Sequence, residues 1–194
     1  MKKIVLASNN VHKVKEIKEI LNNYDILTMN DISFYDDIVE DGETFFDNAL
    51  IKAKTISKFI REKGLDYDVI SDDSGLCCNG LDGAPGVYSA RYAGNHDDQA
   101  NRNKIIEELK DKDKSAYFIC CMVLYHTDDT YSSYEGITNG VIISEERGKT
   151  DFGYDPIFLS DDLGVTFGEA SDEAKNSVSH RKRALEKLKV DLDK

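Results

Sequence analysis

No proline-, glycine- or serine-rich stretch interrupts the 194 residues of the sequence, so no segment has the composition of a linker between domains. Chains of roughly 150 to 200 residues commonly form one domain. The composition therefore predicts a single domain over residues 1–194, which could still be divided into two lobes.

The sequence also lacks a long apolar run. Its first apolar segment ends at Leu6, which is too short for the core of a signal peptide or for a membrane span of about 20 residues. Nothing in the sequence directs export, and no association with a membrane is expected.

The cysteine spacings typical of metal and redox sites are missing. The four cysteines form two adjacent pairs, Cys77-Cys78 and Cys120-Cys121, without the two-residue gap of zinc knuckles and redox motifs. We expect reduced thiols that pack as small apolar groups. Such thiols fit a reducing, cytoplasmic compartment.

No run of lysine and arginine offsets the acidic balance of the chain. Lysine and arginine number 25 against 37 aspartate and glutamate, a formal net charge of -12. This charge repels a nucleic-acid polymer at long range and argues against one as partner. A small polyanion could still bind, because a few cations, backbone amides and a metal ion can reverse the potential locally.

Apolar periodicity predicts strands and helices that intermingle along the chain, as in α/β proteins with a mixed sheet. The expected strands cover residues 3–7, 67–71, 116–125, 131–144 and 156–159. The expected helices cover residues 14–21, 43–63, 98–109 and 179–188. The second strand is expected to end at Ser71, followed by Asp72-Asp73-Ser74-Gly75 and then by a glycine-rich loop that contains Pro85.

The loop after the first strand contains Ser8, Asn9, Asn10 and Lys13. Free amides at the start of the following helix favour an anion, and Lys13 could neutralise phosphate oxygens. The alternative is an ordinary helix cap with a solvated lysine. The Gly-x-x-x-x-Gly-Lys-Ser/Thr pattern is absent, so this loop is not a P-loop.

Acidic side chains occur at two places that suit Mg²⁺, which prefers oxygen ligands. Asp72 and Asp73 follow an apolar strand, and on an extended chain only one of the two enters a common site. Glu40 and Glu43 precede the long helix, where the helix dipole alone also favours acids. A solvated turn remains the alternative for the aspartate pair.

Aromatic and cationic side chains late in the chain could hold a purine. Phe152 and Tyr154 can stack on a base, and Asp155 can accept a hydrogen bond from a base N–H. Lys175, His180 and Arg181 could contact phosphate or a base edge. The same residues could equally form a turn and a solvated helix face.

Taken together, five blocks resemble the inosine-triphosphatase (Ham1-like) family in order and spacing over essentially the whole chain. The blocks are Ser8-Asn-Asn-Val-His-Lys13 with Glu16, Ser71-Asp-Asp-Ser-Gly-Leu76, Gly83-Ala-Pro-Gly-Val-Tyr-Ser-Ala-Arg-Tyr-Ala-Gly94, Phe152-Gly-Tyr-Asp-Pro-Ile-Phe158 and Lys175-Asn-Ser-Val-Ser-His-Arg181.

The resemblance implies an α/β fold with an elongated mixed sheet, helices on both sides, and two lobes enclosing a nucleotide cleft, as in Maf-like proteins. It implies a homodimer that hydrolyses non-standard purine triphosphates (ITP, dITP, XTP) to the monophosphate and pyrophosphate with Mg²⁺. Two rivals remain: a Maf-like pyrophosphatase of different base specificity, and a nucleotide-binding module without turnover.

The resemblance also implies roles for single residues. Asp73 is the metal ligand and general base, Lys13 acts on the triphosphate, and Glu43 or Glu40 completes the metal shell. The substrate-binding positions are Ser8, Asn9, Asn10, Val11, His12, Lys13, Ser74, Phe152, Gly153, Tyr154, Asp155, Lys175, His180 and Arg181.

Three positions depart from the family pattern. Asp151 stands where the family usually has a second glycine before Phe-Gly-Tyr-Asp, Asn79 replaces a usual acid, and Asp82 replaces a usual glycine. The shape of the base pocket and the path of the loop after Asp-Asp-Ser-Gly are therefore less defined than the catalytic positions.

Overall fold

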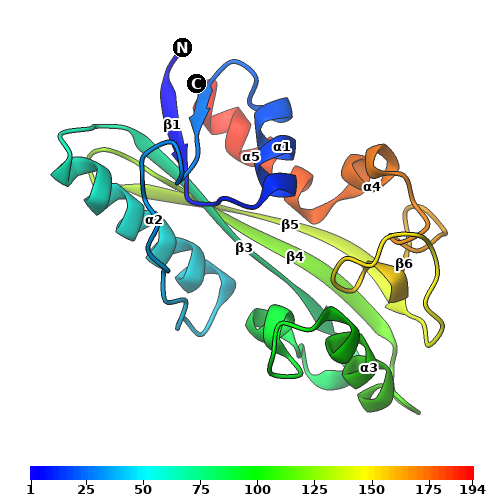
Figure 1. Ribbon diagram of the computed structural model, residues 1–194. Helices are drawn as coiled ribbons and strands as arrows, with labels where there is room; N and C mark the ends of the chain where they lie inside the picture. Colours follow the sequence, from blue (N-terminus) through cyan, green and yellow to red (C-terminus); the bar gives the residue numbers. More distant parts are fainter. The chain divides into compact units, whose positions relative to one another are not determined.

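A computed structural model describes residues 1–194 and contains one six-stranded sheet with the order β2-β1-β3-β4-β5-β6 (Figure 1). Both β2 and β3 pair with β1 in parallel, whereas β6 pairs with β5 in antiparallel orientation. The predicted α/β class with a mixed sheet is therefore confirmed. The strands are β1 (Lys3–Leu6), β2 (Asp25–Leu27), β3 (Asp68–Cys78), β4 (Ser115–Tyr125), β5 (Tyr131–Ile142) and β6 (Phe158–Ser160).

Five α-helices and three short 3-10 helices accompany the sheet. The α-helices are α1 (Val11–Ile20), α2 (Phe45–Glu62), α3 (Asp98–Glu108), α4 (Asp172–Val178) and α5 (His180–Leu192), and the 3-10 helices are η1 (Asn79–Leu81), η2 (Gly86–Arg91) and η3 (Asp155–Ile157). None of the helices is both long enough and apolar enough to cross a membrane.

The chain divides into two compact units. The first contains residues Met1–Asp73, Cys121–Glu135 and Arg183–Lys194, and the second contains Ser74–Cys120 and Gly136–Lys182. Three of the four chain boundaries between them, at 73/74, 120/121 and 135/136, fall inside long strands, and the fourth, at 182/183, falls inside α5.

In the first unit, α2 covers one face of the strands. Thr44 and Asp47 form a capping box that starts this helix, and its apolar side chains pack against Val5, Val69 and Val123. The side chains that α2 contributes recur at helical spacing and are Ala49, Ala53, Ile56 and Ile60.

Helices α1 and α5 lie on the other side of β1 from α2 (Figure 1). Because side chains alternate along a strand, Ile4 and Leu6 point away from Val5 and toward these helices. Both are fully buried, as are Ile17 of α1 and Leu185 of α5. This unit therefore has helices on both sides of its strands.

The core of the second unit is aromatic. Phe118 of β4 lies between Phe158 and Phe167, with ring centroids 4.6 and 5.9 Å away, and Leu76 and Ile105 complete the cluster. The prediction of reduced, buried cysteines is confirmed, since all four are free and buried: Cys77, Cys78, Cys120 and Cys121.

The predicted end of the second strand at Ser71 is wrong, because β3 continues to Cys78. Aspartate and glycine favour turns, but cross-strand pairing can override such a preference. The C-terminal end of β3 is also stabilised by hydrogen bonds that its backbone amides donate. Leu76 N–H donates to Ser89 Oγ (2.9 Å) and Cys78 N–H donates to Ala84 O (3.0 Å). Asp72 and Asp73 are thus strand residues, which fixes the direction of each side chain.

Two of the departures from the family pattern fit the structure without strain. Asp82 adopts a left-handed backbone with φ 52°, a conformation that aspartate tolerates better than most residues. Asn79 donates from Nδ2 to Ser115 Oγ at 2.8 Å. Both side chains belong to the short turn that follows β3.

Candidate functional site

A lysine and a buried carboxylate form the centre of the candidate site in the first unit. Lys13 Nζ lies 2.7 Å from Asp72 Oδ2, and the Asp72 side chain is 1% exposed. Lys13 belongs to the first turn of α1, which follows β1 after a short loop, and Asp72 lies in β3 beside β1. The pairing of these two strands brings residues 59 positions apart into contact.

Asp73 has a different environment from its neighbour. Its Oδ2 accepts a hydrogen bond from Asn48 Nδ2 of α2 at 3.1 Å, whereas Asp72 pairs with Lys13 of α1. Alternation along β3 therefore turns the two carboxylates toward helices on different faces of the sheet. Burial raises the pKa of Asp73, the charge of Glu40 raises it further, and Lys52 and Asn48 offset only part of this effect.

Lys52, a residue of α2, lies close to the acidic side chains of the candidate site. Its Nζ lies 3.2 Å from Glu40 Oε1. Burial alone would lower the pKa of Lys52, but the charges of Asp72, Glu40 and Asp73 together raise it. Three carboxylates and two lysines, Lys13 and Lys52, thus form one coupled electrostatic group in this unit.

Lys52 and Asn48 are residues that the sequence analysis missed. Both are buried on the apolar face of α2, next to Ala49 and Ala53. A buried lysine on the core face of an amphipathic helix is rare unless it is paired. Two polar residues spaced i, i+4 within an apolar stripe were therefore the available signal.

The arrangement of acids matches a two-carboxylate site for Mg²⁺ better than a three-carboxylate site. No group of three or more His, Cys, Asp or Glu side chains gathers as a metal shell, and Glu43 is exposed. Mg²⁺ commonly uses one or two carboxylates together with waters and substrate phosphates. Asp73 and Glu40 are the pair that could supply such ligands, since Glu40 is near enough for its charge to raise the pKa of Asp73.

The loop before α1 is ordered by its own side chains. Asn10 Oδ1 caps the helix by accepting from the amides of His12 (3.1 Å) and Lys13 (3.2 Å). Ser8 Oγ accepts from the Asn10 amide, and Asn9 Oδ1 accepts from the Asn30 amide. Two of the amides expected to attract an anion are therefore occupied, which shifts that role toward Lys13 Nζ. Val11 is exposed at the start of the helix.

A second cluster of predicted residues lies in the second unit. Lys175 Nζ lies 2.5 Å from Asp155 Oδ2, and Asp155 is buried. Burial raises the pKa of Asp155, and the positive charges of Lys175 and Arg181 offset this in part. Lys175 Nζ also lies 5.5 Å from the centroid of the Phe152 ring.

The two aromatic residues of this cluster differ in exposure. Phe152 is 52% exposed, whereas Tyr154 is buried and donates its hydroxyl to Ser89 O at 2.6 Å. Tyr154 is therefore part of the core, and Phe152 is the ring of the two that solvent reaches. His180 is buried with its ring stacked on Phe118 at 5.2 Å.

Ser74 and Gly153 complete the predicted set in this unit. Ser74 is partly buried in β3 next to Asp73 along the chain, and Gly153 has a left-handed backbone with φ 54°. Among the predicted residues, Lys13, Asp73 and Glu40 are thus coupled in the first unit, and Phe152, Asp155, Lys175 and Arg181 in the second.

An α/β fold in which coupled carboxylates and lysines gather just beyond the end of β1, from the middle of β3 and from α1 and α2, suits phosphate chemistry. A model of the Ham1 family matches residues 4–191. The chain belongs to this family, and the resemblance inferred from the sequence is confirmed.

Several relatives and solved structures are similar over almost their full length. The dITP/XTP pyrophosphatase of Clostridium perfringens is 48% identical, with 99% of this chain and 98% of the relative covered. That of Bacillus subtilis is 43% identical, with 97% and 96% covered. The structure of a Ham1 protein from Coxiella burnetii has a TM-score of 0.90 and 39% identity, with 100% and 99% covered. The Staphylococcus aureus Ham1 protein has a TM-score of 0.89 and 36% identity, with 99% and 98% covered.

Proposed function

We propose that this protein is a nucleoside-triphosphate pyrophosphatase that hydrolyses non-standard purine nucleotides (ITP, dITP and XTP) to the monophosphate and pyrophosphate. The observation that carries the proposal is the coupling of Lys13 and Lys52 to the carboxylates of Asp72, Asp73 and Glu40. The similarity to enzymes named dITP/XTP pyrophosphatase supports the substrate class.

In the proposed reaction, Asp73 accepts a proton from water as the water oxygen bonds to the α-phosphorus. The bond between the α-phosphorus and the bridging oxygen to the β-phosphorus breaks, and pyrophosphate leaves with that oxygen. Because its pKa is raised, Asp73 is better suited to act as a general base than an aspartate with an ordinary pKa. Lys13 and Lys52 stabilise the negative charge that develops on the phosphates.

The phosphate end of the substrate is assigned to the turn before α1. Ser8, Asn9, Asn10, Val11 and His12 shape this turn, and Lys13 supplies its cation. Lysine suits this role because its ammonium acts as a compact charge that can contact several phosphate oxygens.

Mg²⁺ is the cation that fits the oxygen ligands of this unit. Asp73 and Glu40 would hold it, and the exposed Glu43 is left as the less favoured candidate. When bound, Mg²⁺ neutralises phosphate charge and polarises a bound water.

The base end is assigned to the cluster of the second unit. Phe152 offers a ring for stacking, Gly153 allows close approach, and Asp155 with Lys175 offers an acceptor and a donor. Tyr154, His180, Arg181 and Ser74 complete this assignment, with Tyr154 and His180 acting from buried positions.

Selectivity against adenine in this proposal arises at C6 of the purine, whereas guanine, which also has a 6-oxo group, is excluded at its 2-amino group. Hypoxanthine and xanthine present an acceptor oxygen at C6, whereas adenine presents a donor amine that leaves a pocket donor without a partner. Such a buried group costs about 1 to 3 kcal/mol, which corresponds to roughly ten- to hundredfold selectivity per contact.

The acidic charge and the absence of any helix that could span a membrane accord with a cytoplasmic enzyme that acts on free nucleotides. We extend the proposal to a homodimer, as the family resemblance implies. Gel filtration with light scattering tests that assembly directly.

A panel of nucleotides, assayed for pyrophosphate and for orthophosphate with Mg²⁺ and with chelator, tests the function. We expect ITP, dITP and XTP to be converted far faster than ATP or GTP, with pyrophosphate as product. Preference for pyrimidine or modified nucleotides would instead identify a Maf-like specificity. Calorimetric binding of a nucleotide without any product would identify a binding module, and release of orthophosphate would contradict the proposed bond cleavage.

A further inference from the structure

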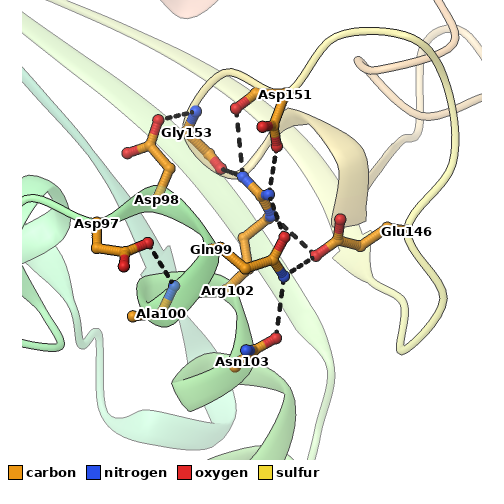
Figure 2. A network of polar contacts seen from close by, with 9 residues as sticks. All are labelled: Asp97, Asp98, Gln99, Ala100, Arg102, Asn103, Glu146, Asp151 and Gly153. Atoms are coloured by element: carbon orange, nitrogen blue, oxygen red, sulfur yellow. Dashed lines mark hydrogen bonds and ion pairs between the residues drawn. The ribbon is translucent and has the colours of Figure 1, made fainter.

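The buried guanidinium of Arg102 joins α3 to the segment that precedes Tyr154 (Figure 2). The side chain is 0% exposed. Its Nη1 donates to Gly153 O (2.8 Å) and Asp151 O (3.4 Å), its Nη2 to Asp151 Oδ1 (2.5 Å) and its Nε to Glu146 Oε1 (3.0 Å). One residue thus contacts three positions of the same loop.

Two further side chains of α3 hold the same loop. Asp98 Oδ2 accepts from the Gly153 amide at 2.8 Å, and Gln99 Nε2 donates to Glu146 Oε1 at 2.6 Å. The amide of Gly153 is therefore fixed by Asp98 while its carbonyl is fixed by Arg102 (Figure 2). Both peptide groups that flank the Gly153 Cα are held by one turn of α3.

Other parts of the loop have different anchors. The amide of Arg147 donates to Pro156 O, and the amide of Lys149 donates to Gly168 O. Besides Glu146, α3 holds positions 151 and 153, which flank Phe152. The backbone on both sides of Phe152 is therefore fixed by contacts with Arg102 and Asp98.

We propose that Arg102 is a positioning residue for base recognition, which holds residues 151–153 so that Phe152 is presented to the purine. This inference rests on the proposed function, because it assigns Phe152 to the base. Arginine is suited to the task because its planar fork of donors can bind a carboxylate and backbone carbonyls at fixed angles at the same time.

The contacts with backbone carbonyls outweigh the ion pair in this arrangement. The Asp151 carboxylate is 86% exposed, and an ion pair that solvent reaches contributes little. Gly153 is less exposed than Asp151, so its carbonyl contacts the same buried guanidinium with less competition from water. Asp151, at a position where the family usually has glycine, adds a partner for Arg102 without being the main restraint.

The test compares Arg102→Met with Lys104→Met. Both substitutions remove one cation from α3, but Lys104 Nζ donates to Tyr92 O and not to the loop at residues 146–153. Hydrogen–deuterium exchange of residues 151–153 is measured alongside kcat and KM for dITP and XTP. Thermal melting establishes that each variant is folded.

In Arg102→Met we expect exchange at residues 151–153 to become at least about tenfold faster. KM for dITP and XTP should rise on the order of tenfold with kcat changed by less than about threefold, because base binding contributes equally to the ground and transition states. The preference over ATP should fall. Lys104→Met should show none of these changes. Arg102→Lys should have a KM between that of the wild type and that of Arg102→Met.

A milder variant covers the case in which Arg102→Met does not fold. Asp98→Ala removes the acceptor of the Gly153 amide and leaves Arg102 in place, so the same changes are expected at smaller size. Unchanged exchange or unchanged KM in the folded variants, with an active wild type, overturns this inference alone. A wild type that releases no pyrophosphate from dITP or XTP overturns the proposed function as well.

Discussion

Lys13 Nζ and Asp72 Oδ2 lie 2.7 Å apart and link the first turn of α1 to β3. The Asp72 carboxylate is almost completely buried, whereas Lys13 retains 20% exposure of its side chain. The buried carboxylate therefore holds the lysine ammonium, while part of the lysine side chain stays exposed. In the proposed mechanism, Asp72 fixes a cation and Asp73 is left for proton transfer.

Asp73→Asn keeps the side-chain size but removes the charge that accepts a proton and attracts Mg²⁺. We expect kcat for XTP to fall by on the order of 10²-fold or more, the lower end of a general-base contribution. Steady-state assays at saturating substrate measure this, after circular dichroism has shown a native fold. Near-normal turnover in the folded variant would exclude the assigned role.

Asp72→Asn is the matched control on the same strand. It removes the counter-charge of Lys13, so we expect a raised KM and a free energy of unfolding lowered by about 1 to 3 kcal/mol. This range lies below the figure for a fully buried pair because Lys13 is partly exposed. A larger loss of kcat than in Asp73→Asn would mean that the two carboxylates exchange roles.

Lys52→Met should impair the enzyme through the charge balance of the site. Without its ammonium, the carboxylates of Asp72, Asp73 and Glu40 repel one another more strongly, and one cation that faces the phosphates is lost. We expect kcat/KM to drop by at least about tenfold. Lys54→Met, at an exposed position of the same helix, controls for the loss of one charge, and equal activities of the two variants would argue against Lys52.

Removal of divalent metal should abolish turnover reversibly. Asp73 and Glu40 offer only oxygen ligands, which favour Mg²⁺ over softer metals. EDTA should stop pyrophosphate release, and excess Mg²⁺ should restore it. Full activity in a thoroughly demetallated sample would contradict a metal-dependent mechanism.

Most helices and strands could be predicted because their signals, apolar spacing and capping side chains, lie within short stretches of sequence. The apolar spacing of α2 and the capping side chains around residue 44 determine a helix by short-range contacts. The three-residue strand β2 and the seven-residue helix α4 were not predicted, since such short elements carry too few residues for a period to emerge. The extension of β3 through Asp72 and Asp73 was not predicted, because it is stabilised by pairing with neighbouring strands and not by the preferences of its own residues.

Residues of the candidate site could be predicted where they lie in a sequence block typical of the family. Residues that join the site only through tertiary contacts could not. Lys13, Asp73 and Asp155 lie in recognisable blocks. Lys52 and Arg102 do not, because each derives its importance from partners far away in the sequence, such as Asp72 and Gly153. Helical spacing alone could show that both are polar residues on helices, but not which carboxylate or carbonyl each one meets.

Gly148→Ala should destabilise the loop that leads to Phe152. A Cβ at this position would lie 2.0 Å from the carbonyl carbon and oxygen of Gly168, and the backbone has φ +104°. Gly164→Ala is the matched control, because Gly164 also has a positive φ (+69°) but nothing lies within 4 Å of its added Cβ.

Backbone strain alone costs on the order of 1 to 3 kcal/mol, so Gly164→Ala should lower the free energy of unfolding by about that amount. Gly148→Ala should lower the free energy of unfolding by at least about 1 kcal/mol more. The atoms that the new methyl group meets belong to the backbone of Gly168, which cannot move aside as a flexible side chain can. Urea denaturation monitored by circular dichroism gives both values. Equal losses in the two variants would show that the loop accommodates the methyl group, and the close approach of Gly148 to Gly168 would then not be required for stability.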